Sequence, residues 1–216
     1  MNSPEPILPE LILYDYWRSG AAYRVRIALE LKGFPYRALP IDLLAGEQLT
    51  AGYRAINPQG LVPTLETGGE RLAQSGAILE WLEEVYPKPP LLPQTPLGRQ
   101  IVRAMAATVG CDIHPLNNLR VLKTLRESLH ASEEQVQAWI GHWIHEGCVA
   151  LERMVTEHGG AFAYGDHPTL ADCYLAPQFY SAERFKVDLS PFPILRRVVA
   201  HARAQPAFQR AYPTEK

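Results

Sequence analysis

The chain of 216 residues has few cysteines, no long apolar run and almost no net charge. Cys111, Cys148 and Cys173 are odd in number and form no C-x-x-C pair, which argues against a disulfide framework or a zinc site and favours a reducing cytoplasm. The residues before Cys111 contain no thiol, so the chain supplies no cysteine chemistry in its N-terminal half. No apolar run approaches the roughly 18 residues that a membrane helix needs.

The balance of charge excludes a general electrostatic attraction for nucleic acid. The chain has 21 Lys and Arg against 23 Asp and Glu, a formal net charge of −2. A bound anion must therefore be held by a local group of cations. We also expect no signal peptide, because prolines and glutamates interrupt the N-terminus before the first basic residue, Arg18.

A group of prolines predicts two domains. Five prolines fall between residues 87 and 96, where each disfavours helix. We therefore expect an N-terminal domain over 1–87, a stiff linker over 88–97 and a C-terminal domain over 98–216.

The hydrophobic patterns predict an α/β domain followed by an all-α domain. A strand at 11–14, a helix ending at Gly33 and a strand at 36–43 indicate a βαβ unit with parallel strands. Residues 62–67 and 70–73 indicate a hairpin, and a helix is expected from Ser75, which completes a βαβ–ββα arrangement.

The C-terminal part is expected to be a bundle of five or six helices. Apolar residues recur there at three- and four-residue intervals, in the runs 98–109, 115–129, 133–157, 170–184 and 193–204. Thr169 and Asp172 form a predicted capping box, so we assign Asp172 a structural role. His142 and His145 are more consistent with packing than with a metal site, because no third ligand has suitable spacing.

Three local features could bind an extended peptide with an amino-acid-like head. Ser19 lies before the first predicted helix, where free N–H groups and the helix dipole favour negative charge. Val62 precedes a proline at a strand entry, where a cis peptide bond would turn the Val62 backbone groups outward. Gln74 and Ser75 open another helix and form a possible second anion site. For Ser19 and Ser75, the alternative is an ordinary helix cap.

These motifs resemble the zeta class of the cytosolic glutathione transferases. The similar segments are Tyr16–Ser19, Tyr23–Leu29, Asn57-Pro58, Val62-Pro63 and Gln74-Ser75. Segments 17–20, 110–118 and 182–189 are similar to the maleylpyruvate isomerase branch of that class. The resemblance covers residues 11 to about 210, nearly the whole chain. It implies a thioredoxin-like N-terminal domain, an all-helical C-terminal domain, a homodimer and glutathione as a bound co-substrate.

The resemblance also implies which residues hold glutathione. Gln74 and Ser75 would bind the γ-glutamyl end and Val62 the cysteinyl backbone. Gln48 would lie near the glycyl end, and Ser19 near the sulfur.

Residues of the helical domain would close the pocket. The resemblance implies that His114, Asn118 and Arg120 contact glutathione or the substrate, and that Arg18 and Arg184 bind substrate carboxylates. Simpler alternatives remain: Arg184 as a surface charge, Arg120 paired with a neighbouring helix, and His114 as a helix cap.

One departure from the family pattern concerns the loop after Ser19. Zeta enzymes typically have a second serine and a cysteine there, where this chain has Gly20 and Ala21. The maleylpyruvate branch shares the glycine but usually keeps a hydroxyl at the next position. Ser19 is therefore the single hydroxyl of this loop.

The resemblance implies a glutathione-dependent cis–trans isomerase of maleyl keto-diacids in aromatic-compound degradation. The thiol would belong to glutathione, activated by Ser19, while Arg18, Arg120 and Arg184 would offset the charge of a dianionic substrate. Two alternatives remain open: a glutathione-conjugating transferase or dehalogenase, and a non-catalytic glutathione-binding module.

Overall fold

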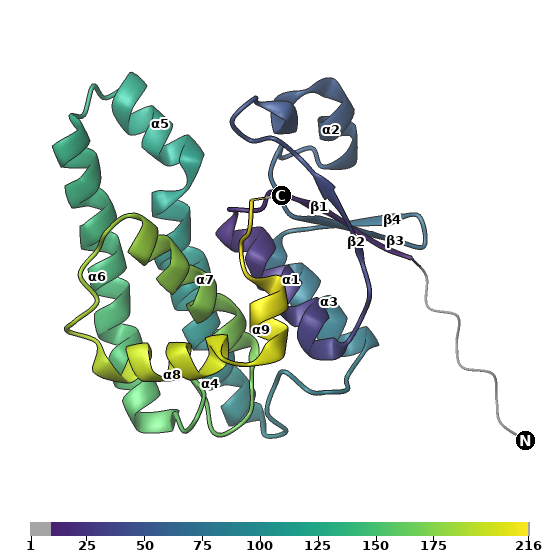
Figure 1. Cartoon of the computed structure of the whole chain (residues 1–216), viewed down its shortest axis with the longest axis vertical. Coiled ribbons are helices and arrows are strands. Elements are labelled where there is room, and N and C mark those ends of the chain that lie inside the picture. Colours follow the sequence, from purple (N-terminus) through teal and green to yellow (C-terminus); the bar gives the residue numbers. More distant parts are fainter. Residues whose placement is uncertain (1–9, 216) are drawn as a thin grey trace, which may run out of the picture.

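The computed structural model describes residues 10–215, in which a small sheet with its helices lies beside a bundle of helices (Figure 1). The sheet-containing part holds β1 (Leu11–Asp15), α1 (Gly20–Lys32), β2 (Arg37–Pro40), a short 3₁₀ helix (Glu47–Leu49), α2 (Ala51–Ile56), β3 (Thr64–Thr67), β4 (Glu70–Ala73) and α3 (Ser75–Val85). The helical part holds α4 (Pro96–Ala107), a π-helical segment (Thr108–Ile113), a 3₁₀ segment (His114–Asn117), α5 (Leu119–Glu127), α6 (Glu133–His158), α7 (Leu170–Arg184), α8 (Pro193–Arg203) and α9 (Pro206–Ala211).

The sheet has the predicted topology. Its four strands run in the order β2-β1-β3-β4, with β1 parallel to β2 and antiparallel to β3. Alternate residues of β1 point into the core, where Leu11 and Leu13 are buried. The expected βαβ–ββα arrangement is confirmed.

The second strand is shorter than its pattern predicts. It ends at Pro40, whereas alternating apolar residues indicated a strand as far as Leu43. Asp42 explains the difference, because its carboxylate accepts hydrogen bonds from the backbone N–H groups of Leu44 and Ala45 and turns the chain. The 3₁₀ helix and α2 that follow were not predicted.

The predicted helices of the C-terminal part are present with shifted ends. Pro96 occupies the first turn of α4, where a missing N–H costs no hydrogen bond. The expected helix at 115–129 starts later, at Leu119, because the π-helical and 3₁₀ segments occupy residues 108–117. Helix α9 was not predicted, and it lies beside α1 (Figure 1), where Arg26 Nε donates to the carbonyl oxygen of Ala211 at 3.0 Å.

The predicted capping box at the start of α7 is confirmed. The carboxylate of Asp172 accepts from the backbone N–H of Thr169 at 2.8 Å and from that of Ala163 at 2.9 Å. Burial raises the pKa of Asp172 to about 6. These bonds give Asp172 a structural role at the start of the helix that spans the bundle.

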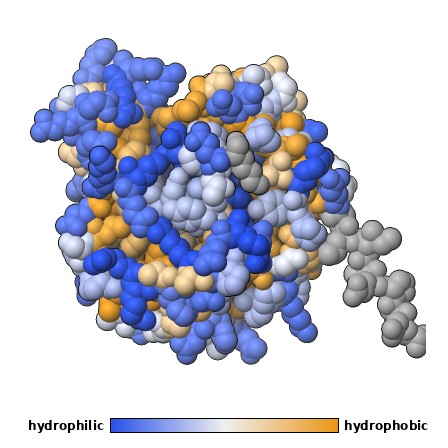
Figure 2. Space-filling model, in the orientation of Figure 1, coloured by the Kyte–Doolittle hydropathy of each residue, from blue (hydrophilic) through white to orange (hydrophobic). Residues whose placement is uncertain are grey.

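The surface of the molecule is mixed in character. Figure 2 shows hydrophobic residues in patches among hydrophilic ones on this face. Among residues 10–215, no helix is both long and apolar enough to cross a membrane.

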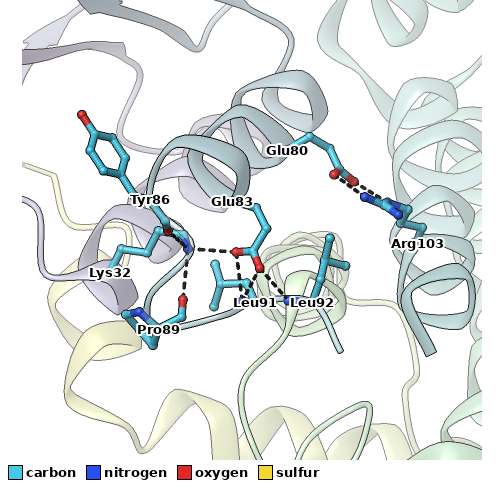
Figure 3. Close-up of polar contacts among 8 residues, drawn as sticks. All are labelled: Lys32, Glu80, Glu83, Tyr86, Pro89, Leu91, Leu92 and Arg103. Carbon is cyan, nitrogen blue, oxygen red and sulfur yellow. Dashed lines mark hydrogen bonds and ion pairs between the residues drawn. The ribbon is translucent and has the colours of Figure 1, made fainter. Parts of the chain in front are cut away.

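A buried ion pair holds the chain segment that leads from α3 to α4. Lys32 Nζ lies 2.9 Å from Glu83 Oε2 and donates to the carbonyl oxygens of Tyr86 and Pro89 at 2.6 and 3.0 Å (Figure 3). Both charged residues are buried. The lysine thus satisfies the carbonyl group of Tyr86, which caps α3, and that of Pro89 in the connecting segment.

The glutamate of this pair holds the other side of the same segment. Glu83 accepts hydrogen bonds from the backbone N–H groups of Leu91 and Leu92 (Figure 3). The carbonyl oxygen of Leu91 in turn accepts from the N–H of Leu170 at the start of α7, at 2.9 Å. The Lys32–Glu83 pair therefore links α1, α3, the connecting segment and α7.

We predict that Glu83→Gln destabilises the protein by about 3–5 kcal/mol, because it leaves the Lys32 charge buried without a carboxylate. Glu84→Gln is the matched control, since Glu84 is the exposed neighbour of Glu83. Urea unfolding of both variants measures the effect. Equal unfolding midpoints for the two variants would contradict the assigned role of the pair.

Candidate active site

Ser19 forms the N-cap of α1, at the end of the loop that follows β1. Its Oγ accepts a hydrogen bond from the N–H of Ala22 at 3.2 Å. The cap interpretation is therefore correct, and it leaves the hydroxyl hydrogen free to donate to a ligand. The neighbouring residues Gly20 and Ala21 have no polar side chain, so Ser19 alone offers a hydroxyl at this helix end.

His114, which belongs to the helical part of the molecule, lies at the same N-terminal end of α1. A Cβ atom added to Gly20 would lie 3.4 Å from Cε1 of the His114 ring, so the two residues are in contact. Burial, together with the positive charges of Arg24 and Arg184, lowers the pKa of His114 to about 3. The imidazole is therefore neutral at physiological pH and adds no charge to the site.

Arg18 and Arg184 lie close enough to influence one another. Partial burial lowers the pKa of Arg184, and the positive charge of Arg18 lowers it further. The Arg18 guanidinium lies over the ring of Trp17, 5.4 Å from its centre, and Arg184 lies over that of Phe185 at 4.4 Å. Within residues 10–215, neither arginine forms an ion pair. Two neighbouring cations without a carboxylate form a suitable place for a dianion.

The predicted peptide-binding residues lie at the start of β3 and of α3. The Val62-Pro63 peptide bond is cis, and β3 begins only at Thr64, so Val62 lies outside the paired residues of the sheet. Gln74 has a φ of 67°, which is unusual for a residue with a side chain, and its Nε2 donates to Gln59 Oε1 at 2.6 Å. The buried Ser75 is the first residue of α3.

The remaining predicted residues make only local contacts. Gln48 donates to the carbonyl oxygen of Leu43 at 3.4 Å, and its buried Oε1 has no hydrogen-bond partner among the residues described. Asn118 caps α5 by accepting from the N–H of Arg120 at 3.1 Å. The exposed Arg120 forms no ion pair within the described part of the chain. The structure therefore brings Ser19, His114, Arg18 and Arg184 together but shows no contact that joins Arg120 to them.

A cavity of about 380 Å³ lies between α1, α3, α4 and α7, and among its lining residues Arg24 and Tyr174 were not predicted as site residues. Arg24 and Tyr174 line it together with Gln74 and Ser75. The available signal was the pair of arginines, Arg24 and Arg26, in the otherwise apolar stretch 23–29, since a charge on the buried face of a helix needs a partner. Nothing in the residue pattern of α7 indicated that Tyr174 would line the cavity.

Metal ligands are not grouped in the part of the chain that the structure describes. No set of three or more His, Cys, Asp and Glu residues there could hold an ion. His142 and His145 instead make ring contacts with Trp143 and Phe192, at centroid distances of 4.9 and 5.3 Å.

We predict that the His114 ring does not titrate between about pH 5 and pH 8. Its pKa of about 3 in the folded protein lies below the usual 6.5, so the folded state resists protonation of this ring. The free energy of unfolding is therefore not reduced by this ring above pH 6.5, and it decreases as the pH falls from there towards about 3, because the unfolded chain then binds the proton more readily. The measurement is the pH dependence of the ring proton signals in NMR, with His114→Gln to assign them. A titration of His114 near its usual value would contradict the prediction.

Comparison with known proteins identifies the family. Residues 13–90 match the family model for the N-terminal domain of glutathione S-transferases. A maleylpyruvate isomerase from Ralstonia sp is 53% identical, over 93% of this chain and 96% of that protein. A maleylacetoacetate isomerase from Pseudomonas aeruginosa is 52% identical, over 94% of this chain and 96% of that protein.

Solved structures agree with this result. The holo structure of a maleylpyruvate isomerase, described as a bacterial zeta-class glutathione S-transferase, superposes with a TM-score of 0.92 at 52% identity, covering 94% of this chain and 96% of that one. A maleylacetoacetate isomerase from Anaeromyxobacter dehalogenans with bound glutathione gives 0.85 at 48% identity, covering 94% and 95%. The expected thioredoxin-like N-terminal part and helical C-terminal part are confirmed. The chain belongs to the zeta class of the glutathione S-transferase family, together with the maleylpyruvate and maleylacetoacetate isomerases.

Proposed function

We propose that the protein is a glutathione-dependent cis–trans isomerase of maleyl keto-diacids, which converts maleylpyruvate to fumarylpyruvate or maleylacetoacetate to fumarylacetoacetate. One observation carries the proposal: Arg18 and Arg184 lie near one another, without an ion-pair partner among the described residues, in a site that also contains the N-terminus of α1. The names of the relatives support the same reaction class and the use of glutathione.

Four predicted residues would hold the parts of glutathione, and two of them, Gln74 and Ser75, line the cavity. Gln74 and Ser75 lie at the start of α3 and suit the γ-glutamyl end, while Val62 offers unpaired backbone groups to the cysteinyl unit. Gln48 has a buried amide oxygen without a partner and suits the glycyl end. When bound, glutathione supplies a thiol that adds reversibly to the maleyl double bond, permits rotation about the resulting single bond and then leaves.

Ser19 would activate the thiol of glutathione. Its hydroxyl hydrogen is free to donate to a sulfur atom, and the dipole of α1 favours negative charge at the same place. Both effects lower a thiol pKa by stabilising the thiolate. Since Gly20 and Ala21 provide no second hydroxyl, this activation depends on Ser19.

The arginines would bind the substrate and offset its charge. The maleyl substrate is a dianion, and glutathione carries a net charge of −1, so the two repel one another in the absence of cations. Arg18 and Arg184 can each bind a carboxylate through two hydrogen bonds, and Arg120 is a further candidate. His114 and Asn118 would complete the pocket from the helical side. The same cations stabilise the negative charge that develops on the substrate carbonyl as the thiolate adds.

The proposal also includes the oligomeric state and the cellular location of the protein. The family resemblance supports a homodimer. The three cysteines are free, and two of them, Cys148 and Cys173, are buried, which supports a location in the reducing cytoplasm.

The test of the function is turnover of maleylpyruvate and of maleylacetoacetate with glutathione in catalytic amounts. We expect the fumaryl product to form while the concentration of free thiol stays constant, because the thiol is released in each cycle. Net consumption of glutathione would instead indicate a conjugating transferase or dehalogenase. Glutathione binding without turnover of either substrate would indicate a binding module, and both results would contradict the proposal.

We predict that Arg184→Ala lowers kcat/KM for the diacid by about 10- to 100-fold, because it removes a charged hydrogen-bonding partner of a carboxylate. Its glutathione Kd should change less than about threefold. Arg153→Ala is the matched control, since Arg153 is exposed on α6 and forms no ion pair with the described residues. An equal loss in kcat/KM for the diacid and in affinity for glutathione would contradict the assigned role of Arg184.

A further inference from the structure

Among the residues that the structure describes, Arg24 is a buried charge without a countercharge. Only 4% of its surface is exposed. Arg26, two residues further along α1, shows how such a charge is usually accommodated: its Nη1 contacts both carboxylate oxygens of Asp15, at 2.7 and 2.8 Å. Its Nε and Nη2 donate to carbonyl oxygens as well. Arg24 has no comparable set of partners, although burial of an unpaired charge is costly.

The contacts of Arg24 leave its charge uncompensated. Its Nη1 donates to Ser75 Oγ at 3.3 Å, and its guanidinium lies 4.3 Å from the centre of the Tyr174 ring. Its buried Nε has no hydrogen-bond partner in residues 10–215. The ionisable groups that act on it are the phenol of Tyr174 and the thiol of Cys111, neither of which is a carboxylate. Burial lowers the pKa of Arg24 to about 10, so the side chain remains protonated at neutral pH.

The cavity beside Arg24 offers other groups that attract an anion. Ser75, Gly76 and Ala77 of the first turn of α3 line it, and N–H groups of a first helical turn lack helical partners. Glu80 is the acidic residue of the lining, but both of its oxygens accept from Arg103, at 2.8 and 2.7 Å (Figure 3). The cavity thus keeps an excess of positive charge next to Ser75.

Tyr174 holds the guanidinium in place. A Cβ atom on Gly76 would lie 2.9 Å from the Tyr174 hydroxyl, and one on Gly110 would lie 2.9 Å from Cε1 of the ring. The ring therefore fits between α3 and the π-helical segment because both residues are glycines. A fixed ring on one side of Arg24 leaves the guanidinium oriented before any ligand binds.

We propose that Arg24 is the buried countercharge for the α-carboxylate of the γ-glutamyl residue of glutathione, with Ser75 and the first turn of α3 as its neighbours. The assignment rests on the proposed use of glutathione and adds a residue to it. The charged Nη1–H donates to Ser75 Oγ, which polarises the hydroxyl and makes its hydrogen a better donor to a carboxylate. Arg24 would thus act on the carboxylate both by its charge and through Ser75.

The proposal predicts that Arg24 recognises one carboxylate of glutathione and not the other. The test compares the Kd of glutathione with that of 4-aminobutyryl-cysteinyl-glycine, which lacks only the γ-glutamyl carboxylate, by titration calorimetry. We expect the analogue to bind the unaltered protein about 10- to 100-fold more weakly than glutathione does. Arg24→Gln should reduce this difference in affinity, leaving only the part that Ser75 and the first turn of α3 provide, and Arg24→Lys, which keeps the charge, should retain more of it.

Glutathione with an amidated glycyl carboxylate is the matched control ligand. The loss of affinity of this ligand relative to glutathione should be the same in the unaltered protein and in Arg24→Gln. If Arg24→Gln distinguished glutathione from the aminobutyryl analogue by the same factor as the unaltered protein, the proposal would be overturned.

A second measurement does not depend on the folding of the Gln variant. In the unaltered protein, the NMR signal of the Arg24 Nε–H should shift on addition of glutathione and remain in place with the aminobutyryl analogue. Equal shifts with both ligands, or none with glutathione, would overturn the proposal. Because these are binding measurements, they can succeed in a protein that shows no isomerase turnover, which separates this proposal from the proposed function.

Discussion

Positive charge without a matching carboxylate is the constraint on which the site depends. Elsewhere in the described part of the chain, buried cations are neutralised, as Arg26 is by Asp15 and Lys32 by Glu83. Around the N-terminus of α1, Arg18 and Arg184 have no such partner, and neither does the more deeply buried Arg24. His114 remains neutral among them. A set of cations that is not neutralised internally favours anionic ligands, and the proposed thiolate and maleyl diacid are both anions.

The position of these cations depends on how the two parts of the chain are joined. Arg18 and Arg24 belong to the sheet-containing part, whereas His114 and Arg184 belong to the helical part. The Lys32–Glu83 pair fixes the segment between the parts, and Leu91 links that segment to the start of α7. Since α7 ends at Arg184, an ion pair remote from the site helps to determine where that guanidinium lies.

The sequence predicts those features that depend on neighbouring residues. The parallel βαβ unit, the β3–β4 hairpin, the ends of α1 and the capping box at Thr169 follow from hydrophobic periodicity and local hydrogen bonding, and the structure confirms them. Helix α9 and the low pKa of His114 depend on contacts between distant segments, which periodicity does not report. Arg24 is an intermediate case: its charge within an apolar run was visible, but the absence of a partner became evident only once α3 and α7 were in place.

The central claim is that the proposed reaction takes place between the α1 N-terminus and the unpaired arginines. The most direct measurement is a crystal structure of the protein with glutathione and an unreactive dicarboxylate. The account predicts the sulfur within hydrogen-bonding distance of Ser19 Oγ and the carboxylates of the second ligand on Arg18 and Arg184. A sulfur atom that points into solvent away from Ser19, with the dicarboxylate bound elsewhere, would contradict it.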